Sequence, residues 1–285
     1  MQIDVTFFIV ALICGAILFI FCMIFRRRVR KVLVKDIKIA YRQYGHGKPL
    51  ILIGGYGSSM TVWGRSFLSC LSSHYRVIIF DNRGIGSSTL GTQPYTIEQC
   101  AEDTKGLIDA LKLKEVYVFG YSMGASIAQE LVLRHPSVVK KLILGGANSL
   151  GKTQMKPIVQ RSLADLSGSD NALWRRKVKI MFPINWLKER PYILRLSVKF
   201  NREVMKLQIN ALEKWQGVEE RLKNIKVSTL LIVGQEDIVT PPSNALFILQ
   251  QIKGAWLVQF ANCGHGLIKQ EPSDVARIIK IFLVS

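Results

Sequence analysis

The segment from Val118 to Ala125, with the sequence VFGYSMGA, most constrains what this chain can fold into. It is an apolar run that ends in Gly-x-Ser-x-Gly and passes directly into a helix-compatible run. A serine at such a sharp strand-to-helix turn projects its hydroxyl away from the sheet. The turn closes only if the residues two before and two after the serine have no side chain. Gly120 and Gly124 meet this requirement, so the pattern predicts that Ser122 is a nucleophile.

A serine hydroxyl is a weak nucleophile that needs an imidazole to accept its proton and a carboxylate to orient that imidazole. Of the four histidines, His265 is the favoured base because its flanking glycines, in NCGHG, let a loop hold the ring over a site. His46 and His74 lie in polar connections, and His135 lies where a proline ends a helix. The sequence therefore predicts His265 as the catalytic base.

The predicted acid is Asp237, which follows the strand-like segment 229–233. In an open α/β sheet, sites assemble at the carboxyl ends of the strands, where Asp237 would lie. The neighbouring Glu236 is the competing carboxylate and ranks below Asp237. The order serine, acid, histidine along the chain is that of the α/β-hydrolases.

From about residue 36 to the end, the chain resembles the α/β-hydrolase superfamily. Four segments match in order: LILIGGYG at 50–57, FDNRGIGSS at 80–88, the serine turn, and the acid and histidine loops. The resemblance implies that the backbone N–H groups of Tyr56 and Met123 form the oxyanion hole. Gly54 departs from the pattern, since relatives usually have a histidine there. Asp81 and Arg83 are interpreted as turn-stabilising residues.

Short apolar runs alternate with helical patterns, which predicts an α/β-hydrolase fold with a mostly parallel central sheet. Expected strands include segments 51–53, 77–80, 116–119, 142–144 and 230–233, and expected helices are 96–111 and 124–134. The alternation breaks over 149–226, where helical spacing at 172–187 and 192–212 and the resemblance together imply a helical cap. The predicted division is a tail at 1–4, an anchor at 5–25, a basic juxtamembrane segment at 26–35, core halves at 36–148 and 227–285, and the cap at 149–226.

The N-terminal run from Val5 to Phe25 is uncharged and apolar, and its 21 residues are long enough to cross a bilayer. The basic sequence RRRVRK follows it, whereas a cleaved signal peptide would have its positive charge before the apolar run. A buried core helix is the alternative. The charge asymmetry predicts a single-pass anchor that leaves the catalytic domain facing the cytoplasm.

The formal net charge of +19 lies largely in the cap and the basic juxtamembrane segment. In the cap, basic residues are interleaved with aromatic ones, which is typical of a surface at the level of lipid headgroups. A cap with a packed apolar face and solvated charges is the equal alternative, and nucleic acid ranks far behind. The bilayer hypothesis places six residues at the interface: Trp174, Arg175, Arg176, Lys177, Lys179 and Trp186.

No cofactor or metal is expected, because the sequence has no metal-ligand spacing and no complete dinucleotide fingerprint. Dehalogenases and epoxide hydrolases of this fold resemble each other in having an aspartate at the position of Ser122. The serine at this turn therefore favours acyl transfer to water. Anchor, cap and GYSMG together are similar to membrane-bound monoacylglycerol lipases, which implies hydrolysis of an apolar acyl ester. The alternatives are a hydrolase of small esters, thioesters, lactones or C–C bonds, and a non-catalytic interaction protein. The sequence does not indicate the oligomeric state.

Overall fold

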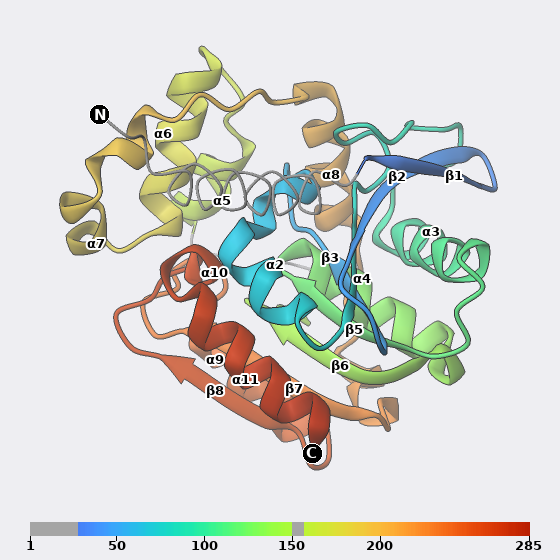
Figure 1. The fold of residues 1–285 in the computed structure, drawn as a ribbon. Helices are drawn as coiled ribbons and strands as arrows, with labels where there is room; N and C mark the ends of the chain where they lie inside the picture. Colours follow the sequence, from blue (N-terminus) through green and yellow to red (C-terminus); the bar gives the residue numbers. More distant parts are fainter. Residues whose placement is uncertain (1–27, 150–156) are drawn as a thin grey trace, which may run out of the picture.

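The computed structural model describes residues 28–149 and 157–285, and in these residues the central element is an eight-stranded sheet (Figure 1). The strand order is β1-β2-β4-β3-β5-β6-β7-β8. At one edge, β2 pairs antiparallel with both β1 and β4. The six strands β3 to β8 are parallel to one another. The strands are β1 Arg30–Val34, β2 Ile37–Tyr44, β3 Pro49–Ile53, β4 Arg76–Phe80, β5 Val116–Tyr121, β6 Val139–Gly145, β7 Ser228–Gly234 and β8 Trp256–Phe260.

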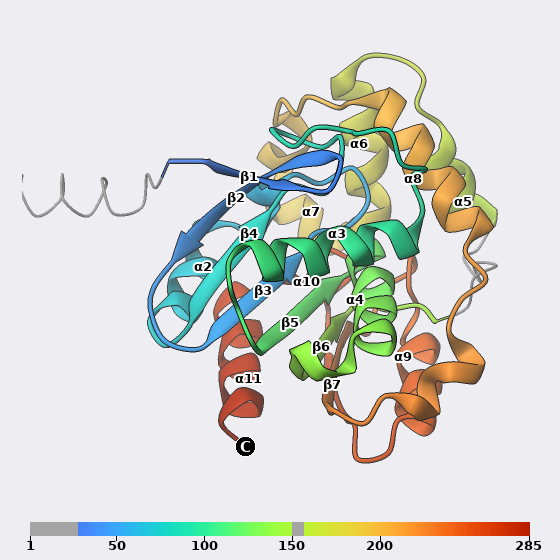
Figure 2. The ribbon, with the colours of Figure 1, turned by 90° about the vertical axis from the view of Figure 1, so that its right-hand side faces the viewer.

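Helices cover both faces of the sheet (Figures 1 and 2). Helices α3, α4 and α9 pack on one face, and α2 and α11 pack on the other. These helices are α2 Arg65–Ser72, α3 Ile97–Ala110, α4 Met123–Arg134, α9 Pro242–Gln251 and α11 Pro272–Val284, and the short α10 spans Leu267–Gln270. The predicted helices at 96–111 and 124–134 correspond to α3 and α4.

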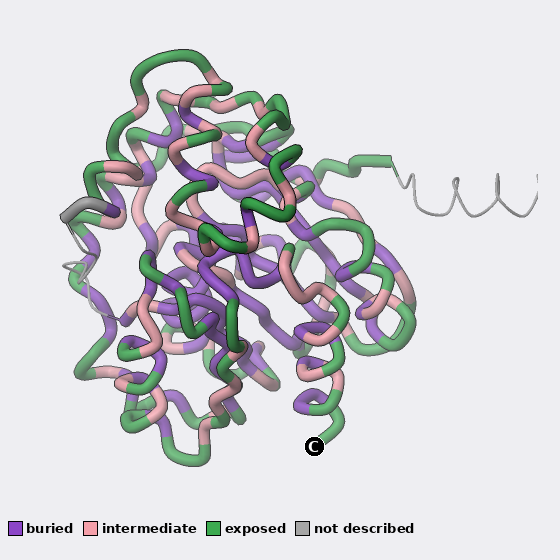
Figure 3. Tube along the Cα trace, turned by 90° about the vertical axis from the view of Figure 1, so that its left-hand side faces the viewer, coloured by how far each residue is buried: buried purple, intermediate pink, exposed green. Residues whose placement is uncertain are grey.

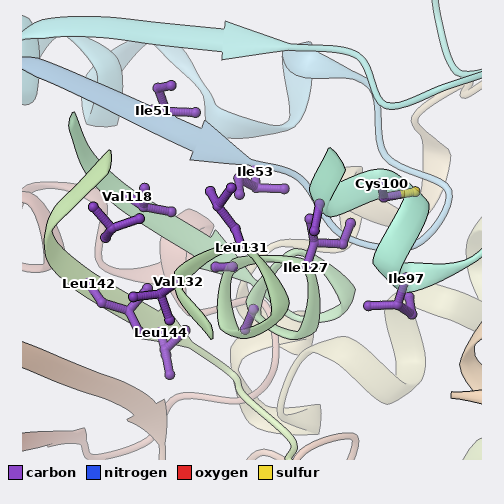
Figure 4. Close-up of a cluster of buried hydrophobic side chains, with 14 of the residues drawn as sticks. Ile51, Ile53, Ile97, Cys100, Val118, Ile127, Leu131, Val132, Leu142 and Leu144 are labelled. Carbon is purple, nitrogen blue, oxygen red and sulfur yellow. The ribbon is translucent and has the colours of Figure 1, made fainter. Parts of the chain in front are cut away.

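The core strands are apolar throughout because successive side chains point to opposite, equally buried faces. In β3, Ile51 and Ile53 face the α3 and α4 layer, while Leu50 and Leu52 face the α2 and α11 layer. All four side chains are fully buried. Figure 4 shows the first layer, where strand residues meet Ile127, Leu131 and Val132 of α4 and Ile97 and Cys100 of α3. Exposed segments lie on the periphery of the molecule (Figure 3).

The segment between β6 and β7 forms a group of helices beyond one end of the sheet, at the top of Figures 1 and 2. The helices are α5 Pro157–Ala164, α6 Asp170–Met181, α7 Ile184–Glu189, the 3-10 helix Pro191–Arg195 and α8 Arg202–Lys214. The helix expected over 192–212 is shorter than predicted. Residues 196–201 are not helical, and α8 begins only where the Asn201 side chain accepts a hydrogen bond from the Val204 N–H.

The predicted anchor at 5–25 lies outside the described residues. Among residues 28–149 and 157–285, no helix is both long enough and apolar enough to cross a membrane.

Candidate active site

Ser122 lies at the turn between β5 and α4, with φ 57° and ψ −124°. Backbone conformations this uncommon for a non-glycine residue persist only where the surroundings hold them, and they cluster at functional sites. The two glycines of the turn are required on steric grounds. A Cβ on Gly120 would lie 2.2 Å from the Gly124 carbonyl oxygen, and a Cβ on Gly124 would lie 2.1 Å from the Ile53 carbonyl oxygen. The turn therefore presses against the end of β3.

One hydrogen-bonded chain joins the three predicted catalytic residues. His265 Nε2 lies 2.9 Å from Ser122 Oγ, and His265 Nδ1 lies 2.7 Å from Asp237 Oδ2. Asp237 follows β7 and His265 follows β8, so three strand ends bring these side chains to one edge of the sheet. The aspartate and the histidine are both buried. This geometry allows His265 to accept the serine proton while Asp237 fixes the imidazole orientation.

Asp237 is further held by two residues of its own loop. The N–H groups of Val239 and Thr240 each donate to Asp237 Oδ1 at 2.8 Å. The Thr240 hydroxyl donates to Asp237 Oδ2 at 2.9 Å and lies 3.1 Å from His265 Nδ1. Thr240 was not predicted, although an aspartate followed three residues later by threonine is typical of such local turns.

Tyr121, the residue before the nucleophile, fixes the other side of the histidine loop. Its hydroxyl donates to the His265 backbone carbonyl at 2.7 Å. Burial, with the charge of Asp237 adding, raises the pKa of Tyr121 well above its usual value, so the hydroxyl keeps its proton. This residue was also not predicted, because its role depends on the approach of two distant loops.

The competing residues lie elsewhere. Glu236 is exposed, and its backbone N–H donates to the carbonyl of Cys263 at 2.8 Å. His46 is exposed in a turn, and His74 bonds a neighbouring serine hydroxyl. His135 Nε2 lies 2.9 Å from a carboxylate of α3. None of these residues lines the cavity that contains Ser122.

The predicted oxyanion residues flank the serine. Tyr56 lies in the loop after β3, and a Cβ built on the adjacent Gly55 would lie only 3.0 Å from the Ser122 Cβ. Met123 is the first residue of α4, where backbone N–H groups have no acceptor within the helix. Tyr56 and Met123 both line the cavity, together with Ser122. Both residues thus lie next to the serine, in the positions that the resemblance implies for the oxyanion donors.

Asp81 and Arg83 are buried beside the site and hydrogen-bonded to neighbouring segments. Asp81 accepts hydrogen bonds from the N–H groups of Met60 and Ser87 at 2.6 and 2.9 Å. Arg83 forms two hydrogen bonds to the Asp103 carboxylate at 2.6 and 2.8 Å. These contacts hold the loops beside the site in place, as the turn-stabilising interpretation requires.

A cavity of about 840 Å³ lies between the sheet edge and the cap. The core contributes Ser122 and His265, and the cap contributes mainly apolar side chains, including Leu163, Trp174 and Met181. Pockets of roughly 300–1,000 Å³ with apolar walls and a few polar groups are typical of small-molecule sites. Across residues 28–149 and 157–285, no cluster of three histidine, cysteine or carboxylate side chains could hold a metal ion.

Lys177 of α6 lines this cavity, which contradicts its predicted place on a lipid-facing surface. It is 6% exposed, and its Nζ lies 4.3 Å from the centroid of the Tyr56 ring. Burial, with the charge of Arg176 adding, lowers the pKa of Lys177 to about 7. Helical spacing was the available signal: Lys177 is four residues from both Leu173 and Met181, on the apolar face of the helix.

Comparison with known proteins gives one consistent family. The sequence matches the family described as alpha/beta hydrolase fold over residues 48–272. A Caulobacter sp. (strain K31) protein assigned as the carbamate hydrolase RutD is 27% identical over 84% of this chain and 93% of its own. The 2-hydroxy-6-oxo-2,4-heptadienoate hydrolase of Pseudomonas putida is 25% identical, and the match covers 90% of this chain and 96% of that hydrolase.

Among solved structures, the esterase EaEST of Exiguobacterium antarcticum has a TM-score of 0.80 and 26% identity. The match covers 90% of this chain and all of the esterase. The family match and these likenesses each cover most of the chain. The protein belongs to the α/β-hydrolase family and is a hydrolase.

Proposed function

We propose that this protein is a serine hydrolase that forms an acyl-enzyme. Ser122 attacks the substrate carbonyl, His265 transfers the proton to the leaving group, and Asp237 orients and stabilises the imidazolium. The N–H groups of Tyr56 and Met123 stabilise the tetrahedral oxyanion, and water activated by His265 then releases the acyl group. The observation that carries this proposal is the continuous chain of hydrogen bonds, 2.9 Å from serine to histidine and 2.7 Å from histidine to aspartate.

The substrate class that we favour is a small carboxylic ester or lactone with an apolar part. A cavity of about 840 Å³ with mainly apolar cap residues suits such a molecule. By their names, the relatives above act on small molecules, and the similar solved structure is an esterase. These likenesses favour the small-molecule alternative over the monoacylglycerol lipase that anchor and cap first indicated. C–C bond hydrolysis is the second candidate, favoured by the likeness to the heptadienoate hydrolase.

The test combines active-site labelling with a substrate panel. A fluorophosphonate probe should label the wild-type protein and the control Ser73→Ala, but not Ser122→Ala. Esters with short and medium acyl chains should then be hydrolysed faster than a monoacylglycerol with a long chain. Labelling of Ser122→Ala at the wild-type level would remove Ser122 as the nucleophile. Fast cleavage of a ring-fission dienoate with slow ester turnover would favour the C–C reaction instead.

We also propose that residues 5–25 anchor the protein as a single-pass segment, with the hydrolase domain facing the cytoplasm. The support is the uninterrupted apolar run and the basic cluster that follows it. The protein should stay in the membrane pellet after a carbonate wash, and protease added to the cytoplasmic side should digest the hydrolase domain. Release by carbonate would contradict the anchor, and protection from protease would reverse the orientation.

A basic cap surface that contacts anionic lipid is a proposal that supplements the anchor. Arg175 and Lys179 are exposed on α6, and on the neighbouring cap segments Ile184 is 65% and Tyr192 is 61% exposed. Exposed apolar and basic side chains together suit a lipid headgroup surface better than nucleic acid. A variant without residues 1–31 should bind anionic vesicles in a salt-sensitive way and not single-stranded DNA. Equal binding to neutral vesicles would contradict this proposal.

A further inference from the structure

Among the described cap residues that line the cavity, Lys177 is the buried cationic side chain. Lys199 is exposed, and the half-buried Arg202 pairs with Asp170 at 2.8 Å. Lys177 is 6% exposed and lines the same cavity as Ser122. In the part of the chain that the structure describes, its Nζ is buried without a hydrogen-bond partner. It also forms no ion pair among these residues. An ammonium group withdrawn from water in this way is strongly disfavoured unless something compensates its charge.

The Tyr56 ring compensates only part of this charge. The ammonium lies 4.3 Å from the ring centroid, within the range of a cation–π interaction, which is weaker than a charge-assisted hydrogen bond. The Tyr56 hydroxyl is itself occupied, because it donates to the Leu163 carbonyl at 3.1 Å. Among the described residues, Lys177 Nζ therefore has no hydrogen-bond acceptor, and a ligand in the cavity that this residue lines would supply one.

The carboxylates of the cavity lining do not serve this lysine. Glu203 and Glu213, both on α8, are exposed, and Glu203 pairs with Lys206 at 3.0 Å. The lowered pKa of Lys177, to about 7, is attributed to burial and to Arg176, and no carboxylate opposes it. Within the part of the chain that the structure describes, the lysine thus lines the cavity without a counter-charge.

We propose that Lys177 binds a carboxylate carried by the substrate, so that this hydrolase selects acidic esters over neutral esters of the same size. The inference rests on the proposed serine hydrolase function and names the substrate class of that site. A bound carboxylate would accept hydrogen bonds from the ammonium and supply the missing counter-charge. The cavity is large enough for an acidic group in addition to the ester that reaches Ser122.

The test compares matched esters in the wild type, Lys177→Met and the control Lys179→Met. Lys179 is exposed on the same helix. One pair carries the carboxylate on the acyl part, para-nitrophenyl hydrogen glutarate against para-nitrophenyl pentanoate. The other carries it on the leaving group, para-acetoxybenzoate against its methyl ester. The wild type and Lys179→Met should prefer the acidic member of at least one pair.

Lys177→Met should lower kcat/KM for the preferred acidic ester by roughly 10- to 100-fold, as expected for a lost hydrogen bond to a charged group. It should leave the neutral ester within about three-fold and should not lower the melting temperature, since a buried unpaired charge is removed. An unchanged ratio of acidic to neutral rates would overturn the inference. Parallel loss on both esters together with a lower melting temperature would also overturn it, by showing that Lys177 is structural.

Calorimetry that measures glutarate binding separates this inference from the proposed function. It is carried out on the wild type, Lys177→Met and the second variant Lys177→Gln. Wild-type binding that both variants lose would support the carboxylate site even if no ester were hydrolysed, a result that removes only the proposed reaction. Ester hydrolysis without Lys177-dependent binding or preference would retain the hydrolase and reject the carboxylate site.

Discussion

Replacing Gly124 with alanine tests how closely the serine turn must pack against the loop after β3 that carries Tyr56. The new Cβ would lie 2.1 Å from the carbonyl oxygen of Ile53. Ile53 is the last residue of β3, and the loop that carries Tyr56 begins after it. The distance of 2.1 Å is roughly 1 Å or more short of ordinary van der Waals separation. Either the loop or α4 must therefore move, and each carries one of the proposed oxyanion amides.

The expected loss follows from that displacement. A misplacement of about 1 Å in a catalytic group lowers the rate by roughly 100-fold, or about 2.7 kcal/mol in activation free energy. Overpacking should in addition lower the free energy of unfolding by about 1–3 kcal/mol. Steady-state kinetics on a short ester give kcat/KM, and urea titration gives the unfolding free energy of the same variant.

Gly54→Ala is the matched control. Gly54 lies in the same loop, but its Cβ would meet only the Ser58 carbonyl oxygen at 3.7 Å, an ordinary contact. This variant should retain activity within a few-fold of the wild type. If Gly124→Ala kept wild-type kcat/KM, or if both variants lost activity equally, the steric argument for the second glycine of the turn would be wrong.

Further substitutions separate the acid from its supports. Asp237→Asn should lower kcat by about 10³–10⁴-fold while Glu236→Gln has little effect, and the opposite result in the same ester assay would move the acid by one residue. Thr240→Val should lower kcat by roughly 10-fold, because it removes one hydrogen bond to the acid, and unchanged kcat would limit Thr240 to folding. Arg221→Met should lower the free energy of unfolding by about 1–3 kcal/mol, because Arg221 bonds the buried Glu130 at 2.6 Å. Burial raises the pKa of Glu130, but hydrogen bonds, first the one from Arg221, outweigh it and lower this pKa below its usual value. The stabilisation by Arg221 is therefore present above pH ~4.5 and is lost in urea titrations at more acidic pH. A difference in unfolding free energy between wild type and Arg221→Met that grows as the pH falls would contradict this.

Local chemistry explains what the sequence could predict. The strand-to-helix turn at Ser122 needs two glycines at fixed offsets, so a short motif specifies its geometry wherever the flanking elements are correct. The parallel strands are buried on both faces, so each is written as a continuous apolar run, and the predicted strand at 142–144 lies within β6. Asp237 and His265 could be chosen because each closely follows such a run.

The remaining features depend on contacts between distant segments. Tyr121 reaches the His265 carbonyl only because β5 and the loop after β8 end at the same edge of the sheet. In the cap, residues 196–201 connect two helices although their neighbours have helical spacing. Asn201, whose side-chain amide donates to the distant Gly84 carbonyl at 3.3 Å, caps α8 there. The pattern of basic residues interleaved with aromatic ones predicts a lipid surface for Lys177, whereas its spacing of four residues from both Leu173 and Met181 indicates the inner face.

The core and the cap contribute different parts of the candidate site, and this division favours a functional explanation of Lys177. On the core side, Asp237 accepts three hydrogen bonds from Val239 and Thr240 besides its contact with His265, so both of its carboxylate oxygens are hydrogen-bonded. On the cap side, among the residues that the structure describes, the buried ammonium of Lys177 is left without an acceptor. Proteins leave a buried charge unpaired mainly where function requires it. Lys177 lines the cavity that contains Ser122, so a ligand that pairs with its ammonium would determine specificity without moving the catalytic residues.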